Sequence, residues 1–352
     1  MTVLEEKQII NPSLEAYDYQ LPETLIARAP KQKRSASRLL CLDQGLQLSH
    51  QSVSDLPDLL KAGDVLVFNN TKVIKARLFA QRKTGAALEL FFLRPLYDEF
   101  NWELLIKPAK RIVEGELIEL DEGVTLKVLK KKAEGIFEGQ CNKSLYDVMN
   151  KKGFVPLPPY MKHSPEAASQ FEDHYQSIFA KHQGAVAAPT ASLHVDAPLK
   201  KTLLEREIGI EELCLHVGYG TFKPLDEARF NEDTLHKERL FIAKETAARL
   251  SAYKAQGRRI IAVGTTMVRS LESLWDGTCF RSDLEETDLF IKPGYHFKAI
   301  SGMLTNFHLP KSSLMLLVSA FVGQDCLKRA YGEAIAKQYQ FYSFGDAMLA
   351  LR

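Results

Sequence analysis

Residues 243–275 read AKETAARLSAYKAQ, Gly257, RRIIAV, Gly264 and TTMVRSLESLW. The first segment predicts a helix that ends at Gly257, because glycine commonly follows a helix C-terminus. RRIIAV predicts a short apolar strand, and TTMVRSLESLW predicts a second helix with Thr265 or Thr266 as its cap. A strand between two helices of this length indicates a sheet that helices cover.

The same alternation continues on both sides of this stretch. Strands are predicted at 288–291 and 303–307, and helices at 312–321 and 326–339. Near the start of the chain, Pro22 opens a short helix and residues 37–42 form a strand. Both ends of the sequence therefore favour an α/β architecture.

Residues 64–139 have a different character. Short runs rich in Val, Ile, Leu and Phe lie at 65–68, 73–79, 88–93, 103–106, 117–120 and 124–129, with breaks at Asn69-Asn70, Gly85, Gly115, Gly123 and Gly135. Short strands at near-regular spacing indicate an all-β unit, either a sandwich or a barrel. We therefore predict an α/β layered domain of residues 1–64 and 154–352, interrupted by an inserted β subdomain at 65–153.

The composition is that of a globular protein. The chain has 352 residues, of which 45% are hydrophobic and 26% charged, so it is long enough for two domains or for one domain with an insertion. Lys plus Arg minus Asp plus Glu is 46 − 44 = +2, which gives no overall electrostatic sign of nucleic-acid binding. An anionic partner must therefore be met by local patches.

Several classes of protein are disfavoured. The first residues lack the apolar core of a signal peptide, and the longest apolar run, 314–322, is well short of the ~20 residues of a membrane span. The five cysteines are scattered without a CxxC motif, which argues against structural zinc and a disulfide framework. We expect a cytoplasmic protein with free thiols and no membrane partner.

Four segments use small or polar residues where a plain core would use large apolar ones: GAVAAPTASLHVD at 184–196, LCLHVGYGTFKP at 213–224, VGTT at 263–266 and LTNFHLPKSS at 304–313. Small residues allow the backbone to approach a ligand closely. Each segment also has an ordinary explanation: a packed strand and turn with a core histidine, a hairpin or bulge, or a capped helix.

Two of these segments suggest particular contacts. Arg269 lies about one turn after Thr265 and Thr266, so helix amides and a guanidinium could together bind a carboxylate or phosphate. Asn306 and His308 are two apart on a strand, so they point to the same face and could share a pocket.

Basic residues are clustered although the total charge is balanced. Residues 24–38 and 71–83 contain no acid, and further groups lie at 107–111 and 130–132. A charge run is usually only a solvated surface, but several beside one β insertion favour an RNA-backbone surface. The predicted nucleic-acid-binding residues are Arg34, Arg38, Lys72, Lys75, Arg77, Lys110 and Arg111.

Nine ordered segments together carry a family resemblance: YDYQLPETLIA, SRLLCLD, GDVLVFNNTKVIKARL, GFVPLPPY, YQSIFAKHQGAVAAPTASLH, LHVGYGTFKP, AVGTTMVRSLES, LTNFHLPKSSLMLLVSAF and FYSFGDAML. Over nearly the full length, they resemble the S-adenosylmethionine:tRNA ribosyltransferase-isomerases of queuosine biosynthesis. The resemblance implies an α/β domain with a β-barrel insertion and a monomeric enzyme. Three positions depart from the family pattern, namely Ser192, Tyr219 and Lys292, and they affect pocket detail only.

The resemblance also implies the reaction. The ribosyl moiety of S-adenosylmethionine, which is consumed, is transferred and isomerised onto 7-aminomethyl-7-deazaguanine at the tRNA wobble position. Epoxyqueuosine-tRNA forms, adenine and methionine leave, and no metal is needed. The sulfonium acidifies the C5′ hydrogens, so the chemistry needs a base, a neutral amine nucleophile and a proton donor to adenine.

Site residues follow from the segments that match the family. The predicted catalytic residues are His194, His216, His308 and Asp346, with His194 as the base, His308 acting with Asn306 to orient substrate, and Asp346 orienting a histidine or facing the sulfonium. The predicted substrate-binding residues are Thr190, Gly218, Gly220, Thr221, Thr265, Thr266, Arg269 and Asn306. Arg269 with the Thr265 and Thr266 amides would hold the methionyl carboxylate or a tRNA phosphate.

Two other functions remain to be weighed. An S-adenosylmethionine-dependent tRNA methyltransferase would suit an α/β chain, but it should show a glycine-rich loop after its first strand, and the sequence has no GxGxxG. A non-catalytic RNA-binding protein would suit the basic clusters, but it would not require small-residue segments that end in histidines.

Overall fold

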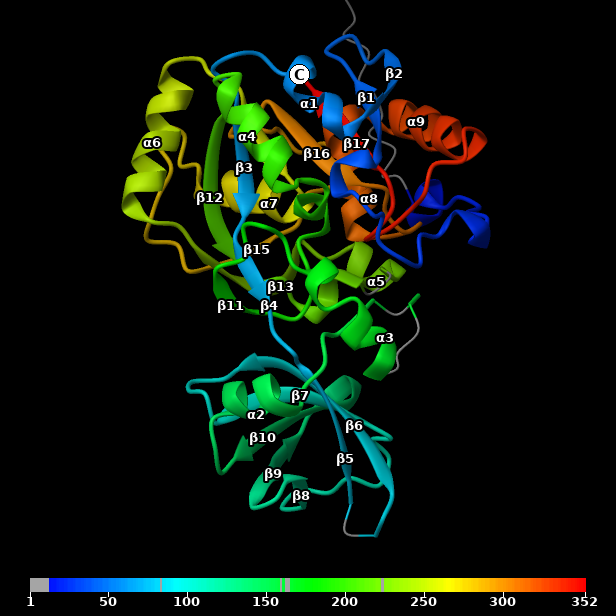
Figure 1. Cartoon of the computed structure of the whole chain (residues 1–352), viewed down its shortest axis with the longest axis vertical. Helices are drawn as coiled ribbons and strands as arrows, with labels where there is room; N and C mark the ends of the chain where they lie inside the picture. Colours follow the sequence, from blue (N-terminus) through cyan, green and yellow to red (C-terminus); the bar gives the residue numbers. More distant parts are fainter. Residues whose placement is uncertain (1–12, 83, 159, 162–164, 223–224) are drawn as a thin grey trace, which may run out of the picture.

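A nine-stranded mixed sheet and a closed six-stranded barrel make up the computed structural model, which describes residues 13–82, 84–158, 160–161, 165–222 and 225–352. The sheet and its helices form one half of the molecule, and the barrel forms the other half, beyond the ends of the sheet strands (Figure 1). This arrangement confirms the predicted α/β layered fold with an inserted β-barrel.

The large sheet has the strand order β15-β13-β12-β3-β14-β16-β17-β1-β2. Its strands are β1 (Arg38–Leu42), β2 (Leu48–Ser52), β3 (Val65–Asn69), β12 (Gly209–Leu215), β13 (Thr234–Phe241), β14 (Ile260–Val263), β15 (Glu286–Leu289), β16 (Gly302–Asn306) and β17 (Ala347–Leu351). β3 pairs in parallel with β12 and β14, and β14 with β16. β17 runs antiparallel to β16 and parallel to β1. The carboxyl ends of β3, β12, β14 and β16 therefore meet the amino ends of β17 and β1 at one edge.

Helices cover both faces of this sheet. They are α1 (Leu56–Leu59), α4 (Ala197–Glu205), α5 (Glu227–Phe230), α6 (Lys244–Ala255), α7 (Thr265–Leu274), α8 (Ser313–Val322) and α9 (Gln324–Ala336). Val65 and Val67 belong to the core formed with α6–α9, whereas Leu66 and Phe68 belong to the core formed with α1 and α4. Side chains alternate between the faces of a strand, so β3 is apolar at every position because both faces are covered.

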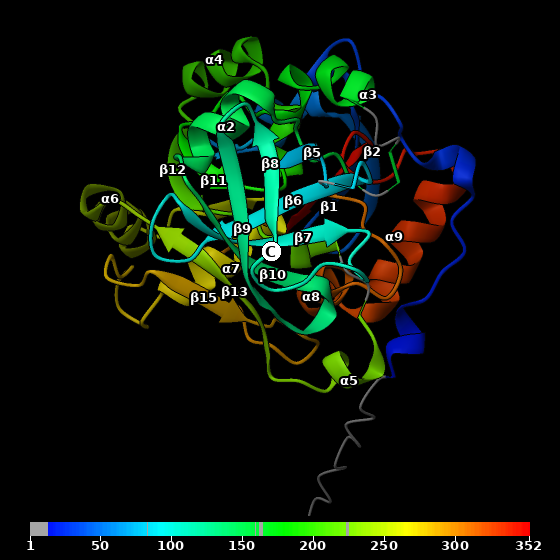
Figure 2. The same cartoon turned by 90° about the horizontal axis from the view of Figure 1, so that it is seen from below.

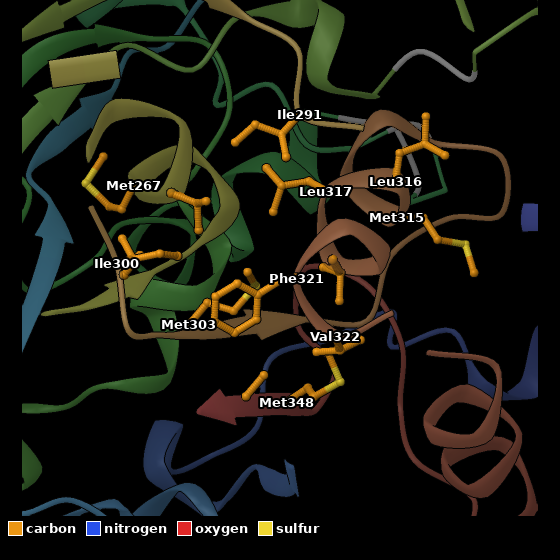
Figure 3. Packing of buried hydrophobic residues seen from close by; sticks show 14 of the residues in the cluster. Met267, Ile291, Ile300, Met303, Met315, Leu316, Leu317, Phe321, Val322 and Met348 are labelled. Carbon is orange, nitrogen blue, oxygen red and sulfur yellow. The ribbon is translucent and has the colours of Figure 1, made fainter. Parts of the chain in front are cut away.

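Helix α8 contributes many buried apolar side chains to the core that contains Val65 and Val67. Figure 3 shows Leu317 and Phe321 of α8 pointing toward the side on which Met267 of α7 and Met303 of β16 lie. The apolar run that is too short for a membrane span is this core helix, and none of the described helices is long and apolar enough to cross a membrane.

The barrel has the strand order β10-β7-β6-β5-β8-β9 and closes on itself. Its strands are β5 (Arg77–Gln81), β6 (Ala87–Pro95), β7 (Asn101–Lys107), β8 (Leu117–Asp121), β9 (Val124–Lys131) and β10 (Ile136–Cys141), and α2 (Leu145–Lys152) packs on them. Trp102, Phe92 and Phe137 fill a core separate from those of the sheet. Figure 2 shows the barrel strands from below, in front of the sheet layer.

Two chain segments join the barrel to the sheet. The outgoing segment contains β4 (Thr71–Val73), and the returning one contains α3 (Pro165–Gln170) and β11 (His182–Ala185), which pairs in parallel with β4. Where they meet, Gly153 has room only for hydrogen: a Cβ there would lie 2.1 Å from the Lys75 carbonyl oxygen. The remaining short turns are the 3-10 helices η1 (Leu14–Tyr17), η2 (Glu23–Leu25), η3 (Arg34–Ala36), η4 (Val53–Asp55), η5 (Ala133–Gly135), η6 (Asp173–Tyr175), η7 (Thr190–His194) and η8 (Tyr219–Phe222).

Two details of the sequence prediction were wrong. Residues 65–68 were assigned to the β insertion, but β3 lies at the centre of the large sheet, and the barrel strands begin at Arg77. A short apolar strand has no pattern that tells which sheet it joins. The cap of α7 is Gly264 (φ 97°), and not Thr265 or Thr266, and no side chain among the described residues caps this helix. Gly257 follows α6 with φ 71°, as predicted.

Candidate functional site

A pocket opens at the edge of the sheet where the strand ends converge. We call it the central pocket; it is lined by Tyr160, Ala188, Pro189, Thr190, Ala191, Val217, Gly264, Thr265, Thr266, Thr305, Asn306, Phe307, His308, Leu309, Ser312, Leu314, Tyr342 and Ser343. Its wall includes the residues that follow β14 and β16 and the first turns of α7 and α8. Crevices at the carboxyl ends of parallel strands are the usual ligand sites of such sheets.

Five predicted site residues meet in this pocket: Thr190, Thr265, Thr266, Asn306 and His308. They come from three of the four segments that the sequence singled out. Strand direction explains the meeting, because β14 and β16 are parallel and their carboxyl ends lie at the same edge.

Asn306 is fixed by three contacts at the end of β16. Its Nδ2 donates to His194 Nε2 at 3.1 Å and to the Tyr342 carbonyl oxygen at 3.0 Å. Its Oδ1 accepts from Thr190 Oγ1 at 3.1 Å. The side chain therefore has one orientation, and it connects η7, β16 and the loop before β17.

His194 lies one layer behind the pocket wall. It is 3% exposed, it does not line the pocket, and Asn306 is its hydrogen-bond partner there. Burial lowers its pKa to about 4, with a smaller opposing effect of Asp346, so the imidazole is neutral at pH 7. The position suits a residue that orients Asn306, and it is less suited to the predicted role of a base in contact with substrate.

His308 lies in the pocket wall itself. Its Nε2 is 2.9 Å from Thr305 Oγ1, and its backbone N–H donates to the Tyr331 hydroxyl at 3.0 Å. The Tyr19 hydroxyl donates to its carbonyl oxygen. Burial lowers its pKa to about 3, so it is a neutral imidazole of fixed orientation at physiological pH.

Asp346 is placed close to the site but has other partners. Its carboxylate, 1% exposed, pairs with Lys31 and accepts the backbone N–H groups of Arg38 and Gln340, both at 2.8 Å. It does not line the central pocket. The predicted role facing the sulfonium is therefore not supported by the geometry, since this carboxylate fixes the loop that precedes β17.

The same segment supplies residues that the sequence reasoning missed. Tyr342 and Ser343 line the central pocket, as does Tyr160 from the returning segment. The Ser343 N–H donates to the Tyr160 hydroxyl at 2.8 Å, and the rings of Tyr160 and Tyr342 have centroids 4.8 Å apart. All three lie in the family-matching segments GFVPLPPY and FYSFGDAML, and this match was the sequence signal that could have identified them as site residues.

A second pocket lies between the barrel and the sheet. We call it the interface pocket; it is lined by Leu93, Arg94, Pro95, Glu103, Ile136 and Tyr146 from the barrel side and by Gly184, His216, Val217, Gly218, Tyr219, Gly220, Arg229, His236, Lys237, Glu238, Arg239 and Glu286 from the sheet side. Val217 lines both pockets, so the two are neighbours.

His216, predicted as catalytic, and Gly218 and Gly220, predicted as substrate-binding, line the interface pocket and not the central pocket. His216 Nδ1 is 2.8 Å from Thr71 Oγ1, and burial lowers its pKa to about 4. Gly184 packs against this ring, where a Cβ would lie 2.7 Å from the His216 Cε1 atom. Thr221 belongs to η8, and its side chain is outside the described part of the structure.

Arg269 has a different partner from the one predicted. Its guanidinium, 6% exposed, pairs with Glu238 and donates through Nε to the Leu289 carbonyl oxygen at 2.8 Å. It does not line the central pocket. This pairing does not support the predicted role, in which Arg269 binds a carboxylate or phosphate together with the Thr265 and Thr266 amides, because Glu238 already holds its guanidinium.

The predicted RNA-binding residues divide into two groups. Arg34, Arg38, Lys75 and Arg77 contact the protein itself: Arg34 bonds the Gln176 carbonyl oxygen at 2.7 Å, Arg38 the Lys337 carbonyl oxygen at 2.6 Å, Lys75 pairs with Glu172 at 2.7 Å and Arg77 with Glu89 at 3.2 Å. Lys72, Lys110 and Arg111 are exposed. The last two lie between β7 and β8 of the barrel.

The three departures from the family pattern lie apart from one another. Tyr219 lines the interface pocket and packs edge-on against Phe91 of the barrel, with centroids 5.5 Å apart. Ser192 is fully buried in η7, and Lys292 donates to the Glu232 carbonyl oxygen at 2.8 Å. Across the described residues, no group of three or more His, Cys, Asp or Glu side chains is arranged to hold a metal ion.

Comparison with known proteins gives one family over nearly the whole chain. A model of the family described as "Queuosine biosynthesis protein" matches residues 14–350. S-adenosylmethionine:tRNA ribosyltransferase-isomerases from Aquifex aeolicus and Natranaerobius thermophilus are 43% and 42% identical over 343 residues, covering 96% and 95% of this chain and 99% and 98% of those proteins. The crystal structure of S-adenosylmethionine tRNA ribosyltransferase from Thermotoga maritima is similar, with a TM-score of 0.53 and 31% identity, covering 96% of this chain and 100% of that one.

Proposed function

The chain belongs to the queuosine biosynthesis protein family, and we propose from this membership that it is an S-adenosylmethionine:tRNA ribosyltransferase-isomerase. It transfers and isomerises the ribosyl moiety of S-adenosylmethionine onto 7-aminomethyl-7-deazaguanine at the tRNA wobble position and releases adenine and methionine. The observation that carries the proposal is the 43% identity to such an enzyme over 96% of this chain. The pocket that brings five of the predicted site residues together supports it. The comparisons favour neither a methyltransferase nor a non-catalytic RNA-binding protein.

The central pocket is the proposed site for S-adenosylmethionine. The N-termini of α7 and α8 both contribute to its wall, and helix N-termini attract a carboxylate such as that of the methionyl group. Tyr160 and Tyr342 offer aromatic rings, which attract a cation such as the sulfonium. Thr190, Thr305 and Asn306 supply hydrogen-bonding groups for the ribose and adenine.

The interface pocket is the proposed site for the acceptor nucleotide. It adjoins the central pocket at Val217, and it is bordered by the barrel on which the exposed Lys110 and Arg111 lie. A wobble base has to leave its stack to reach such a pocket, which costs least in a single-stranded anticodon loop. We further propose that the protein is cytoplasmic and that it acts as a monomer. Analytical ultracentrifugation would check the monomeric state.

His308 and His194 have different proposed roles in the reaction. His308 lines the central pocket as a neutral imidazole and is the better placed to exchange a proton with S-adenosylmethionine. His194 acts through Asn306 and orients it. His308→Ala should therefore lower kcat more than His194→Ala, and His194→Ala should raise the KM for S-adenosylmethionine. The reverse order of kcat values would restore His194 as the base.

The test of the function is the product of a single reaction. The enzyme, S-adenosylmethionine and tRNA bearing 7-aminomethyl-7-deazaguanine should give equal amounts of adenine, methionine and modified tRNA, measured by chromatography and mass spectrometry. Unmodified tRNA is the matched control and should give none. S-adenosylhomocysteine as the product would show a methyltransferase, and tRNA binding without any adenine would show a binding protein.

A further inference from the structure

A buried carboxylate on β13, that of Glu238, lies in the wall of the interface pocket next to the segment that separates the two pockets. The Glu238 side chain is 1% exposed, and its Oε1 accepts the backbone N–H of Gly218 at 2.9 Å. Its Oε2 accepts from Arg269 Nη1, and His236 Nε2 lies 3.7 Å from Oε1. No sequence motif pointed to this residue.

The charge of Glu238 is maintained despite its burial. Burial by itself would raise its pKa, but Arg269, His236 and the Gly218 N–H together outweigh that effect and lower the pKa to about 2. The carboxylate is therefore ionised throughout the physiological pH range. An ionised carboxylate makes a stronger hydrogen bond to an amide than a neutral group does, and its second oxygen is held by the guanidinium.

The segment that Glu238 holds is the shared wall of the two pockets. Val217 lines both, and Gly218, Tyr219 and Gly220 line the interface pocket. Gly220 lies against His236, where a Cβ would be 2.3 Å from the ring, so β13 supports the loop at both glycines.

Arg269 connects this wall to the other pocket. It lies on α7, whose first residues Thr265 and Thr266 line the central pocket. The Glu238–Arg269 pair thus joins the helix that borders the central pocket to the loop that borders the interface pocket. A shift of this loop would change the distance between any two molecules bound on its two sides.

We propose that Glu238 is a positioning residue for ribosyl transfer, whose carboxylate, fixed by Arg269, holds the Gly218 amide and with it the loop 217–220 between donor and acceptor. This proposal rests on the proposed function. It predicts an effect on kcat, because a misplacement of about 1 Å between reactants can cost about 100-fold in rate while each ligand still binds.

Two double variants isolate the bond to Gly218. Glu238→Gln with Arg269→Met removes both buried charges but leaves a side-chain oxygen for the Gly218 amide. Glu238→Leu with Arg269→Met also removes both charges and leaves no acceptor. Asp64→Asn is the control for loss of a buried carboxylate beside an arginine, because Asp64 bonds Arg259 Nε at 2.8 Å at the opposite edge of the sheet.

Each variant is measured for S-adenosylmethionine-binding stoichiometry by calorimetry, for Tm, and for kcat and KM of adenine release. We expect kcat of the Gln–Met variant to stay within about 5-fold of wild type and that of the Leu–Met variant to fall by about 100-fold at full binding stoichiometry. Asp64→Asn should lower Tm. Its kcat, divided by the measured S-adenosylmethionine-binding stoichiometry, should equal that of the wild type.

Three results would overturn the proposal. Equal kcat for the two double variants would show that the Gly218 bond does not position the reactants. A fall in kcat that matches a fall in binding stoichiometry would show a purely structural role. Adenine release that is absent from the wild-type enzyme would overturn the proposed function as well, which distinguishes the two failures.

Discussion

At the scale of the residue, the site is built on neutral imidazoles. His194, His216 and His308 are all held by a neighbouring side chain, and burial lowers the pKa of each, to about 4, about 4 and about 3. A neutral His308 suits the central pocket, which we propose as the site of the sulfonium cation, because an imidazolium there would repel it. The same property gives the protein a measurable dependence of stability on pH.

We expect the free energy of unfolding to fall as the pH is lowered from about 6.5 to about 4.5. In this range the unfolded histidines bind protons and the folded ones do not, so each contributes a slope of about 1.4 kcal/mol per pH unit, or about 4 for the three. The contribution is fully present above pH 6.5. Urea denaturation at several pH values measures it, and His308→Gln should remove about one third of this slope. An unchanged slope in that variant would contradict the assigned burial effect.

At the scale of the element, helix α7 presents an open N-terminus to the central pocket. Its cap is Gly264, and Thr266 has a buried hydroxyl with no hydrogen-bond partner among the described residues. By contrast, α8 begins with Ser312, whose hydroxyl accepts the Met315 N–H at 3.3 Å. A buried polar group without a partner is costly, and the cost would be recovered if the bound substrate supplied the partner.

Thr266→Val should separate stability from binding. The valine keeps the shape and removes the unpaired hydroxyl, so the ligand-free protein should be as stable as wild type or more stable by about 1 kcal/mol. The KM for S-adenosylmethionine should rise about 10-fold, which corresponds to about 1.4 kcal/mol of lost binding. Ser192→Ala removes another buried hydroxyl, one that has no hydrogen-bond partner in the described part of the chain and lies outside the pocket lining, and it should leave KM unchanged. A KM that does not respond to Thr266→Val would exclude the hydroxyl from substrate binding.

At the scale of the whole molecule, the barrel is joined to the sheet at the edge that holds both pockets. β3 ends at Asn69, and the chain leaves through β4 at this point and returns through β11 (Figure 1). A surface for tRNA on the barrel would therefore lie beside the site of chemistry. Lys110 and Arg111 are the exposed basic residues that we assign to it.

Lys110→Ala with Arg111→Ala should weaken tRNA binding without changing the binding of S-adenosylmethionine. Two lost phosphate contacts should reduce the slope of log K against log salt by about 1.5 to 2. Fluorescence anisotropy of labelled tRNA at increasing KCl measures this slope. Lys201→Ala is the control, because Lys201 is an exposed lysine on α4, which covers a face of the large sheet away from the barrel (Figure 1). An equal effect of both variants would point to general charge and not to a surface on the barrel.

The sequence by itself determined the helix–strand–helix unit at 243–275, the presence of a separate β insertion and the small-residue segments around Asn306 and His308. These are local patterns of glycine, apolar periodicity and side-chain size, which survive in one dimension. The family also followed from ordered segments, because their order does not depend on contacts.

Only the tertiary structure decided which residues meet. β3 belongs to the large sheet, His194 lies behind Asn306, and Arg269 pairs with Glu238 across two elements far apart in the chain. The reasons are physical. A buried charge must pair with an opposite charge, and the fold determines which one is near. The loops that share a pocket are set by the parallel pairing of β14 and β16 and not by the spacing of residues along the chain.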